Sequence, residues 1–390
     1  MASSSDRTGY NVLVRDPAGQ VVGTIDTWTK LTLVLKWAGL STWALEVDAG
    51  SSQAGRLVPG GGLYVYGPTS STTPLLTGLM RGLVRADRGT TGDPGRTFAP
   101  TGYGDEWELL TRLCRPTPLA AVTAQGDTHN VSGPAETVLK QLVALNAGQG
   151  AVAERRVPRL DVAPDLGRGR AVAVRERYAN LLDECVRIGQ AVGLGFSVVD
   201  NPDTRRLTFD VTPPRDLTAA VHLSRAAGTL RSSSYSAAGA TGTDALVGGQ
   251  GQGAARTMAT ASSPDPVWQR RVEVYLDRRD TNVLQELVDA GTDALAVALA
   301  DSSLKLAPMD TPQVAFGRDY RLGDRVSVDV DEGITVSDVV RSVTIVVDGT
   351  ADAGVTVTPD VGPPGGTDAL PSTSAIRKLA TRVNQLERRP

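Results

Sequence analysis

The residues that could carry catalysis are few in this chain of 390 residues. The only two histidines, His129 and His222, are far apart in the sequence, so the paired-histidine spacing of a zinc hydrolase is absent. Cys114 or Cys185 with His129 could supply a thiol nucleophile and its base. However, Cys185 falls within the apolar stripe of a predicted helix, and no motif surrounds Cys114. We therefore predict two unpaired, buried thiols.

An acidic cluster and a glycine run also invite a catalytic interpretation. Asp105, Glu106 and Glu108 are close enough to suggest glycosidase carboxylates, but a catalytic pair is positioned by the fold. A local cluster of this kind is more typical of a solvated face. The GGQGQG run at 248–253 lacks the Lys-Ser/Thr pair of a P-loop, so a turn is expected.

Four aspartates near the C-terminal end could suggest calcium binding, but their spacing does not match the D-x-D-x-D-G loop. They are Asp319, Asp324, Asp329 and Asp331. Taken together, these patterns predict no catalytic residue, no cofactor-binding residue and no metal ligand.

Composition narrows the function classes further. The formal charge is −3, with both signs scattered along the chain, which gives no electrostatic reason to expect nucleic acid or an anionic membrane as the main partner. The first ten residues lack the apolar segment of a signal peptide, and no run approaches the roughly 20 apolar residues of a membrane span. We expect a soluble protein made in a cytoplasm, with several compact units.

The stretch that must organise these residues is 176–211, where the hydrophobic period changes from helical to alternating. Apolar residues at steps of three or four predict one face of a helix. They are Tyr178, Leu181, Leu182, Cys185, Val186 and Val192. Gly193 is expected to end this helix, and two alternating runs separated by the turn sequence at 201–203 predict a hairpin after it.

Short strand patterns interrupted by Gly, Pro and Ser precede this stretch. Residues 31–37 and 43–47 alternate and predict a hairpin. Residues 87–103, rich in Gly, Thr, Asp and Pro, are expected to form a long exposed loop that Phe98 could anchor. Ser132 is expected to cap the helix that follows it.

After the predicted hairpin, residues 230–247 and 271–276 have strand patterns, Thr281 is expected to cap a helix, and residues 313–359 return to β.

The sequence thus predicts an α+β fold, mostly β, with two small antiparallel β-barrel-like domains, an inserted α/β lobe and a short C-terminal helix. The predicted units are a barrel-like domain at 1–115, a mixed domain at 116–230, a strand–helix domain at 231–310, a second barrel-like domain at 311–362, a linker at 363–373 and a helix at 374–390.

The C-terminal segment has a candidate oligomer interface. Ile376, Leu379, Val383 and Leu386 lie at steps of three, four and three, the spacing of an a/d seam. The pattern covers only about one and a half heptads, where three or four would define a coiled coil. Two interpretations stay open: a self-associating, three-stranded helix, and a tail that is frayed or docked locally.

Several segments, in their order and spacing, resemble the minor tail hub proteins of long-tailed actinobacterial phages and prophages. They are residues 126–127, the helix at 134–146, RLDVAPD at 159–165, GRG at 167–169, the helix and strand at 176–196, residues 209–216, GGQGQG at 248–253, RRVE at 270–273, residues 319–320 and LGDRV at 322–326. The resemblance spans about residues 33–362.

This resemblance implies a structural virion protein similar to the baseplate hub of contractile phages. In such hubs, three subunits with two barrel-like domains each make a ring that matches the sixfold tail tube. The implied partners are two further copies of the chain, the distal tail protein and other tail-tip or fibre proteins. DNA would be only a passing cargo of the channel, membrane insertion is not expected, and the implied location is the virion tail.

Two alternatives come from other functional classes. A sugar-binding attachment module would need exposed aromatic clusters, which an aromatic content of 4% hardly supplies. A cell-wall hydrolase would need the metal ligands or the nucleophile whose motifs are missing. Larger relatives carry a fibre or wall-degrading domain after the hub, and we expect none here because the chain ends at Pro390.

Overall fold

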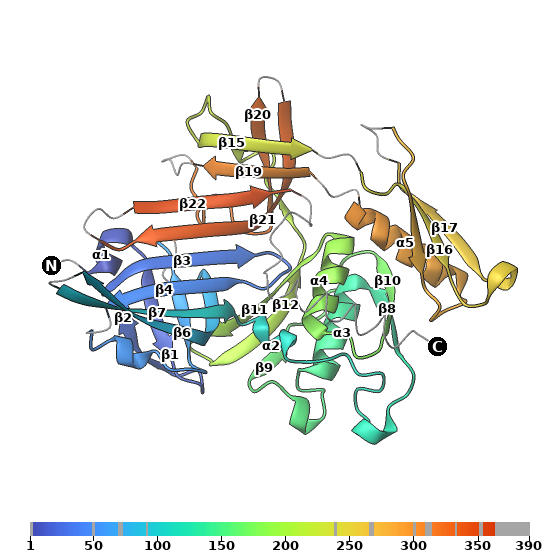
Figure 1. Ribbon diagram of the computed structural model, residues 1–390, viewed down its shortest axis with the longest axis horizontal. Coiled ribbons are helices and arrows are strands. Elements are labelled where there is room, and N and C mark those ends of the chain that lie inside the picture. Colours follow the sequence, from blue (N-terminus) through green and yellow to red (C-terminus); the bar gives the residue numbers. More distant parts are fainter. Residues whose placement is uncertain are drawn as a thin grey trace.

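The computed structural model describes residues 3–48, 51–68, 73–90, 93–237, 240–264, 269–298, 302–308, 314–331, 334–350 and 354–362. Within these ranges the protein is mostly β, with one 14-stranded sheet, three small sheets and five α-helices (Figure 1). The predicted α+β, mostly β, fold is confirmed. Four short 3-10 helices lie at Ala54–Arg56, Val122–Ala124, Ala153–Arg155 and Gly253–Ala255.

The large sheet combines strands from both ends of the chain in the order β15-β19-β22-β21-β3-β4-β7-β6-β5-β1-β2. Its N-terminal strands are β1 (Asn11–Arg15), β2 (Val21–Ile25), β3 (Trp28–Lys36), β4 (Thr42–Asp48), β5 (Gly62–Tyr66), β6 (Leu76–Thr90) and β7 (Asp93–Gly104). Its later strands are β15 (Leu230–Ala237), β19 (Ser302–Pro308), β20 (Asp324–Asp331), β21 (Ile334–Asp348) and β22 (Gly354–Val361), with the short β13 (Arg215–Asp216) and β14 (His222–Leu223) beside β20.

The two predicted barrel-like regions meet directly in this sheet. β3 pairs antiparallel with β21, and Leu33 lies opposite Ile345. The strands of the described residues close no barrel, because β15 and β2 stand at the two ends of the main strand order. The barrel-like character of the two regions therefore stays a prediction, whereas their union in one sheet is observed.

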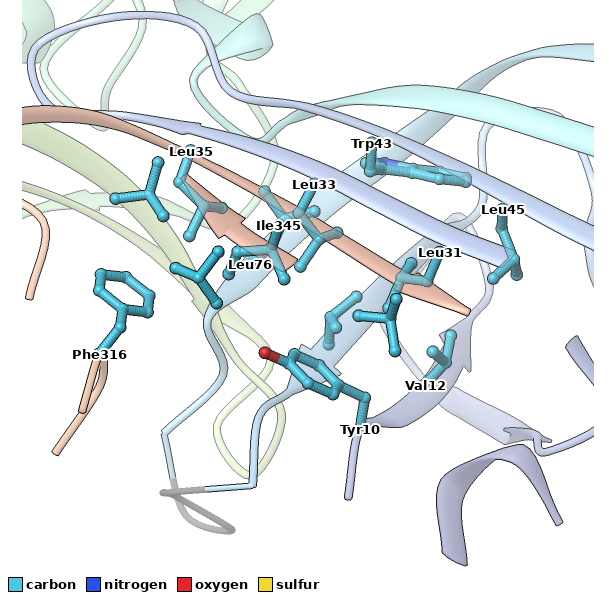
Figure 2. Packing of buried hydrophobic residues seen from close by; sticks show 14 of the residues in the cluster. Tyr10, Val12, Leu31, Leu33, Leu35, Trp43, Leu45, Leu76, Phe316 and Ile345 are labelled. Carbon is cyan, nitrogen blue, oxygen red and sulfur yellow. The ribbon is translucent and has the colours of Figure 1, made fainter. Parts of the chain in front are cut away.

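One hydrophobic core covers the large sheet and takes residues from both ends of the chain. Alternate residues of β3, Leu31, Leu33 and Leu35, point inward as the period of a strand requires, and Ile345 of β21 packs among them (Figure 2). The helix α1 (Ser4–Thr8) begins with a capping box formed by Ser3 and Asp6. The hairpin predicted at 31–47 is confirmed by the pairing of β3 with β4.

A lobe with its own core is inserted in the sequence between the N-terminal and the C-terminal strands of the large sheet. Its helices are α2 (Trp107–Leu110), α3 (Ala135–Asn146) and α4 (Leu181–Val192). Its strands are β8 (His129–Pro134), β9 (Leu160–Val162), β10 (Ala171–Glu176), β11 (Gly195–Asn201) and β12 (Arg206–Thr212). The predicted sequence of a helix, then Gly193 as its C-cap, then a hairpin is confirmed.

Three local predictions are wrong. Tyr178 lies outside α4 and is 45% exposed, because Asn180 caps the helix by accepting from the amides of Leu182 and Asp183. Ser132 is not a helix cap. It lies in β8 and pairs with Ala173 of β10, and α3 begins after Pro134. Residues 87–90 and 93–103 belong to the paired strands β6 and β7, because backbone pairing does not need the apolar alternation that this segment lacks.

The strand–helix region forms a small unit that we call the distal unit. It contains β16 (Asp244–Gly248), β17 (Met258–Ser262), β18 (Glu273–Asp277) and α5 (Leu284–Ala298). The strand predicted over 230–247 is two strands, β15 and β16, which belong to different sheets. The run at 248–253 forms the expected turn region between β16 and β17.

The C-terminal linker at 363–373 and the helix at 374–390 lie outside the described residues. The candidate interface residues Ile376, Leu379, Val383 and Leu386 are therefore not placed. In the part that is described, no helix is both long and apolar enough to cross a membrane.

Candidate functional site

The N-terminal strands, the lobe and the C-terminal strands meet around one cavity of about 200 Å³. Its lining includes Trp37 just after β3, Thr77 of β6, Val198 of β11 and Leu322 just before β20. We call this place the three-way junction. Residues of the lobe contact the large sheet here. We take this junction as the candidate functional site because these contacts fix the position of the lobe on the sheet.

Trp37 joins the three parts at the junction. A Cβ atom at Gly195, the first residue of β11, would lie 2.0 Å from Nε1 of the indole, and one at Gly323, before β20, would lie 2.4 Å from it. Both positions therefore need glycine, and Gly323 also has a φ of +87°. On β21, the guanidinium carbon of Arg341 lies 5.1 Å from the ring centroid. The indole is held by groups from the lobe and from the C-terminal strands.

A buried ion cluster also connects the sheet to the lobe. Arg15 of β1 is 1% exposed and pairs with Asp105, just after β7, and with Asp200 of β11, which is 0% exposed. Burial disfavours the charged form of Arg15, but the two carboxylates outweigh it, and the pKa of the guanidinium is raised. We call Arg15, Tyr64, Asp105, Arg159 and Asp200 the Arg15 cluster.

Asp200 is the centre of this cluster. The Tyr64 hydroxyl donates to its carboxylate at 2.9 Å, and Arg159 of the lobe lies 3.2 Å from it. The Asp200 amide donates to the Thr77 hydroxyl at 3.1 Å. Burial raises the pKa of Tyr64, so its hydroxyl stays protonated as a donor. Arg15, Tyr64 and Thr77 thus fix Asp200 of the lobe against β1, β5 and β6.

Glycine makes room for the long side chains of this site. A Cβ atom at Gly62 of β5 would lie 2.6 Å from Nε of Arg15, and one at Gly104 of β7 would lie 2.0 Å from Oε2 of Glu106. The two strands therefore present bare backbone where charged side chains lie flat on the sheet.

Glu106 lines the cavity and is 8% exposed. Its Oε2 atom has no hydrogen-bond partner among the described residues, and burial raises the pKa of its carboxyl to about 8. The expectation of a solvated acidic face at 105–108 is wrong for Asp105 and Glu106, because the lobe covers them. The carboxylate of Asp105 is bound by Arg15 through its Oδ1 atom.

Replacing Glu106 by glutamine should remove a pH dependence of stability. The unfolded carboxyl releases its proton near the ordinary value of 4.5, but the folded one holds it until about pH 8. The folded state therefore binds the extra proton between these values, and stability falls as the pH rises. Between pH 4.5 and 8, we expect the free energy of unfolding of Glu106→Gln to rise by up to about 5 kcal/mol relative to that of the parent protein.

Urea unfolding of both proteins at about pH 5 and about pH 9 measures this difference. Glu176, whose pKa burial also raises to about 8, contributes the same trend to both proteins and cancels in the comparison. A difference between the two proteins that is the same at both pH values would contradict the assignment.

The other residues with possible chemistry are spread over the molecule. Cys114 and Cys185 are unpaired and buried, as predicted, and burial raises the pKa of each thiol. His129 lies on β8, whereas His222 lies on β14 and pairs with Asp329 at 2.7 Å. Across the described ranges, no three His, Cys, Asp or Glu residues are grouped to hold a metal ion.

The family profile described as Siphovirus ReqiPepy6 Gp37-like protein matches residues 11–362. This range includes the whole large sheet, the lobe and the distal unit. No curated protein sequence matches the chain significantly.

Three solved structures share the fold over nearly their full length. The 43 kDa tail protein of prophage MuSo2 from Shewanella oneidensis has a TM-score of 0.57 at 11% identity, covering 90% of this chain and 98% of its own. A tail protein from Neisseria meningitidis has 0.56 at 14% identity, covering 91% and 97%. The prophage tail protein gp18 from Listeria monocytogenes has 0.54 at 11% identity, covering 96% and 99%.

Proposed function

Because the chain belongs to the family of Siphovirus ReqiPepy6 Gp37-like proteins, we propose that it is the hub of a tail tip. Three copies would form a ring that joins the tail tube and the distal tail protein to a central tip or fibre. The ring would form part of the channel for DNA ejection. The resemblance to siphovirus tail-tip proteins that the sequence suggested is confirmed, and so is the location in the virion tail.

The observation that carries the proposal is the match over almost the whole length of this chain to proteins named as prophage tail proteins. The union of the two β regions through β3 and β21 supports the ring. A chain with two linked β regions could contact two subunits of the tail tube, one with each region. Three chains would then contact all six subunits of a sixfold tube ring. A rigid connection between the regions would keep these positions aligned.

The charges of the junction support a structural role over a catalytic one. Asp105 and Asp200 are bound by arginine, and the unpartnered Glu106 carboxyl is protonated near neutral pH. The ion pairs of Asp105 and Asp200 with Arg15 hold elements of the fold together, which is a structural role.

Light scattering of the purified chain at micromolar concentration tests the proposal. We expect a mass three times the 40.8 kDa of one chain. A mass of six chains would contradict the trimer, and a stable monomer at this concentration would do the same.

The C-terminal seam of Ile376, Leu379, Val383 and Leu386 offers a separate prediction. If it lines a three-stranded bundle, each buried side chain contributes roughly 1.5–3 kcal/mol. Replacing Leu379 and Val383 by aspartate should then raise the dissociation constant of the trimer at least about tenfold, while each subunit stays folded. Sedimentation velocity and circular dichroism measure the two quantities.

The matched control replaces Thr381 and Gln385 by aspartate, which changes the charge equally but lies outside the a/d positions. Equal dissociation of the two variants, or of the seam variant and the parent, would show that the four residues are not a seam.

A further inference from the structure

The distal unit has its own hydrophobic core. Ala245, Val247, Ala259, Leu287 and Leu295 are buried together, and they belong to neither the sheet core nor the lobe core. Gly291 of α5 lets the helix lie directly on β16 and β17, because a Cβ atom there would be 2.9 Å from Cβ of Ala261. The unit therefore has the packing of a separately folded body.

The distal unit contacts the lobe through α5, which lies beside α4 and β10 (Figure 1). Asp293 of α5 is 2.7 Å from Arg170 and 3.6 Å from Arg187 of α4. About two turns earlier on the same face of α5, Glu286 is 3.2 Å from Arg175 of β10. We call these five residues the docking contacts. They place acidic groups of the distal unit against basic groups of the lobe.

The docking contacts are partly open to water. The side chains of Arg170 and Arg187 are 42% and 43% exposed, and those of Asp293, Glu286 and Arg175 are 25%, 24% and 23% exposed. Arg187 is also bound by Glu184 at 2.7 Å within the lobe, so it does not depend on Asp293 for a partner. Ion pairs of this kind contribute little individually and are screened by salt, unlike a buried apolar contact.

From these observations we propose that the distal unit is an arm that is docked on the lobe by ion pairs and can undock as an intact folded body. Its core stays closed when the docking contacts open, because the core and the contacts share no residue. The docking contacts lie within one chain, so the arm would undock in a monomer as well as in a trimer.

Fluorescence energy transfer between two introduced cysteines tests this proposal. Thr204→Cys in the lobe hairpin and Thr260→Cys on β17 are exposed, whereas the natural cysteines are buried and should not react with dyes. Raising the NaCl concentration from about 0.05 M to about 1 M should lower the ratio of docked to undocked molecules about tenfold. Replacing Glu286 by glutamine and Asp293 by asparagine should give the same undocked signal already at low salt.

The control variant replaces Glu273 by glutamine and Asp289 by asparagine. These acids of the distal unit make no ion pair with the lobe in the described structure, and the charge change is the same. It should retain the parent signal at low salt. Transfer that is unaffected by salt and by the docking variant would overturn the proposal. Loss of hydrogen-exchange protection in β16 and α5 on undocking would also overturn it, because the arm would then be unfolding.

Discussion

Replacing Asp200 by alanine is expected to lower the free energy of unfolding by about 3–5 kcal/mol, the range for breaking a buried ion pair. The loss is large because Arg15 stays buried with one carboxylate instead of two, and the Tyr64 hydroxyl keeps only its long 3.5 Å bond to the Gly19 carbonyl. Urea unfolding measures the loss. Hydrogen exchange should also show weaker protection in β1 and β11, the two strands that the ion pair connects.

The matched control for Asp200 is Asp161→Ala, in the same lobe. Asp161 pairs with Arg206, but both side chains are more than two-fifths exposed, so the change should cost less than about 1 kcal/mol. If the two aspartate variants are destabilised equally, the Arg15 cluster is not what holds the lobe on the sheet.

Replacing Ile345 by alanine should destabilise the protein by about 2–5 kcal/mol through the cavity it leaves. Ile345 is fully buried and lies opposite Leu33 at the pairing of β21 with β3. Because this pairing joins the two β regions, the loss should reach the N-terminal region too. We expect faster hydrogen exchange in β4, although the substitution lies some 300 residues later in the sequence.

The control for Ile345 is Val355→Ala on the neighbouring β22, where the side chain is 45% exposed. It should change stability by no more than about 0.5 kcal/mol. Destabilisation by Ile345→Ala with unchanged exchange in β4 would mean that the two β regions unfold independently.

Local patterns predicted the elements whose packing partners are close in sequence. The α4 helix, its stop at Gly193 and the hairpin after it follow from a change in hydrophobic period within a few residues. The β3–β4 hairpin follows from two alternating runs. In both cases the residues that pack together are separated by a short turn, so a local sequence pattern is enough to predict which elements contact each other.

The pairing of β3 with β21 could not be predicted, because the alternation of apolar residues in each strand does not indicate which strand it pairs with. The role of the glycines at 62 and 104 could not be predicted for a related reason. They clear space for the side chains of Arg15 and Glu106, and only the fold brings these groups together.

One signal at the junction was available and was missed. Asp200 continues the inward-facing alternation of Phe196 and Val198 on β11, so a carboxylate falls where the strand period requires burial. An ionisable residue in phase with a buried stripe needs a charged partner. The period thus predicts that a basic residue covers β11, although it cannot identify Arg15 as that residue.

We propose that three copies of this chain form a ring at the tip of a phage tail. An averaged electron-microscopy image of tail tips from particles that contain the chain tests this proposal. Threefold symmetry is expected at the tip, with three copies around the channel and two β regions of each copy facing the tail tube. Six copies in one ring, or a location of the chain away from the tip, would contradict it.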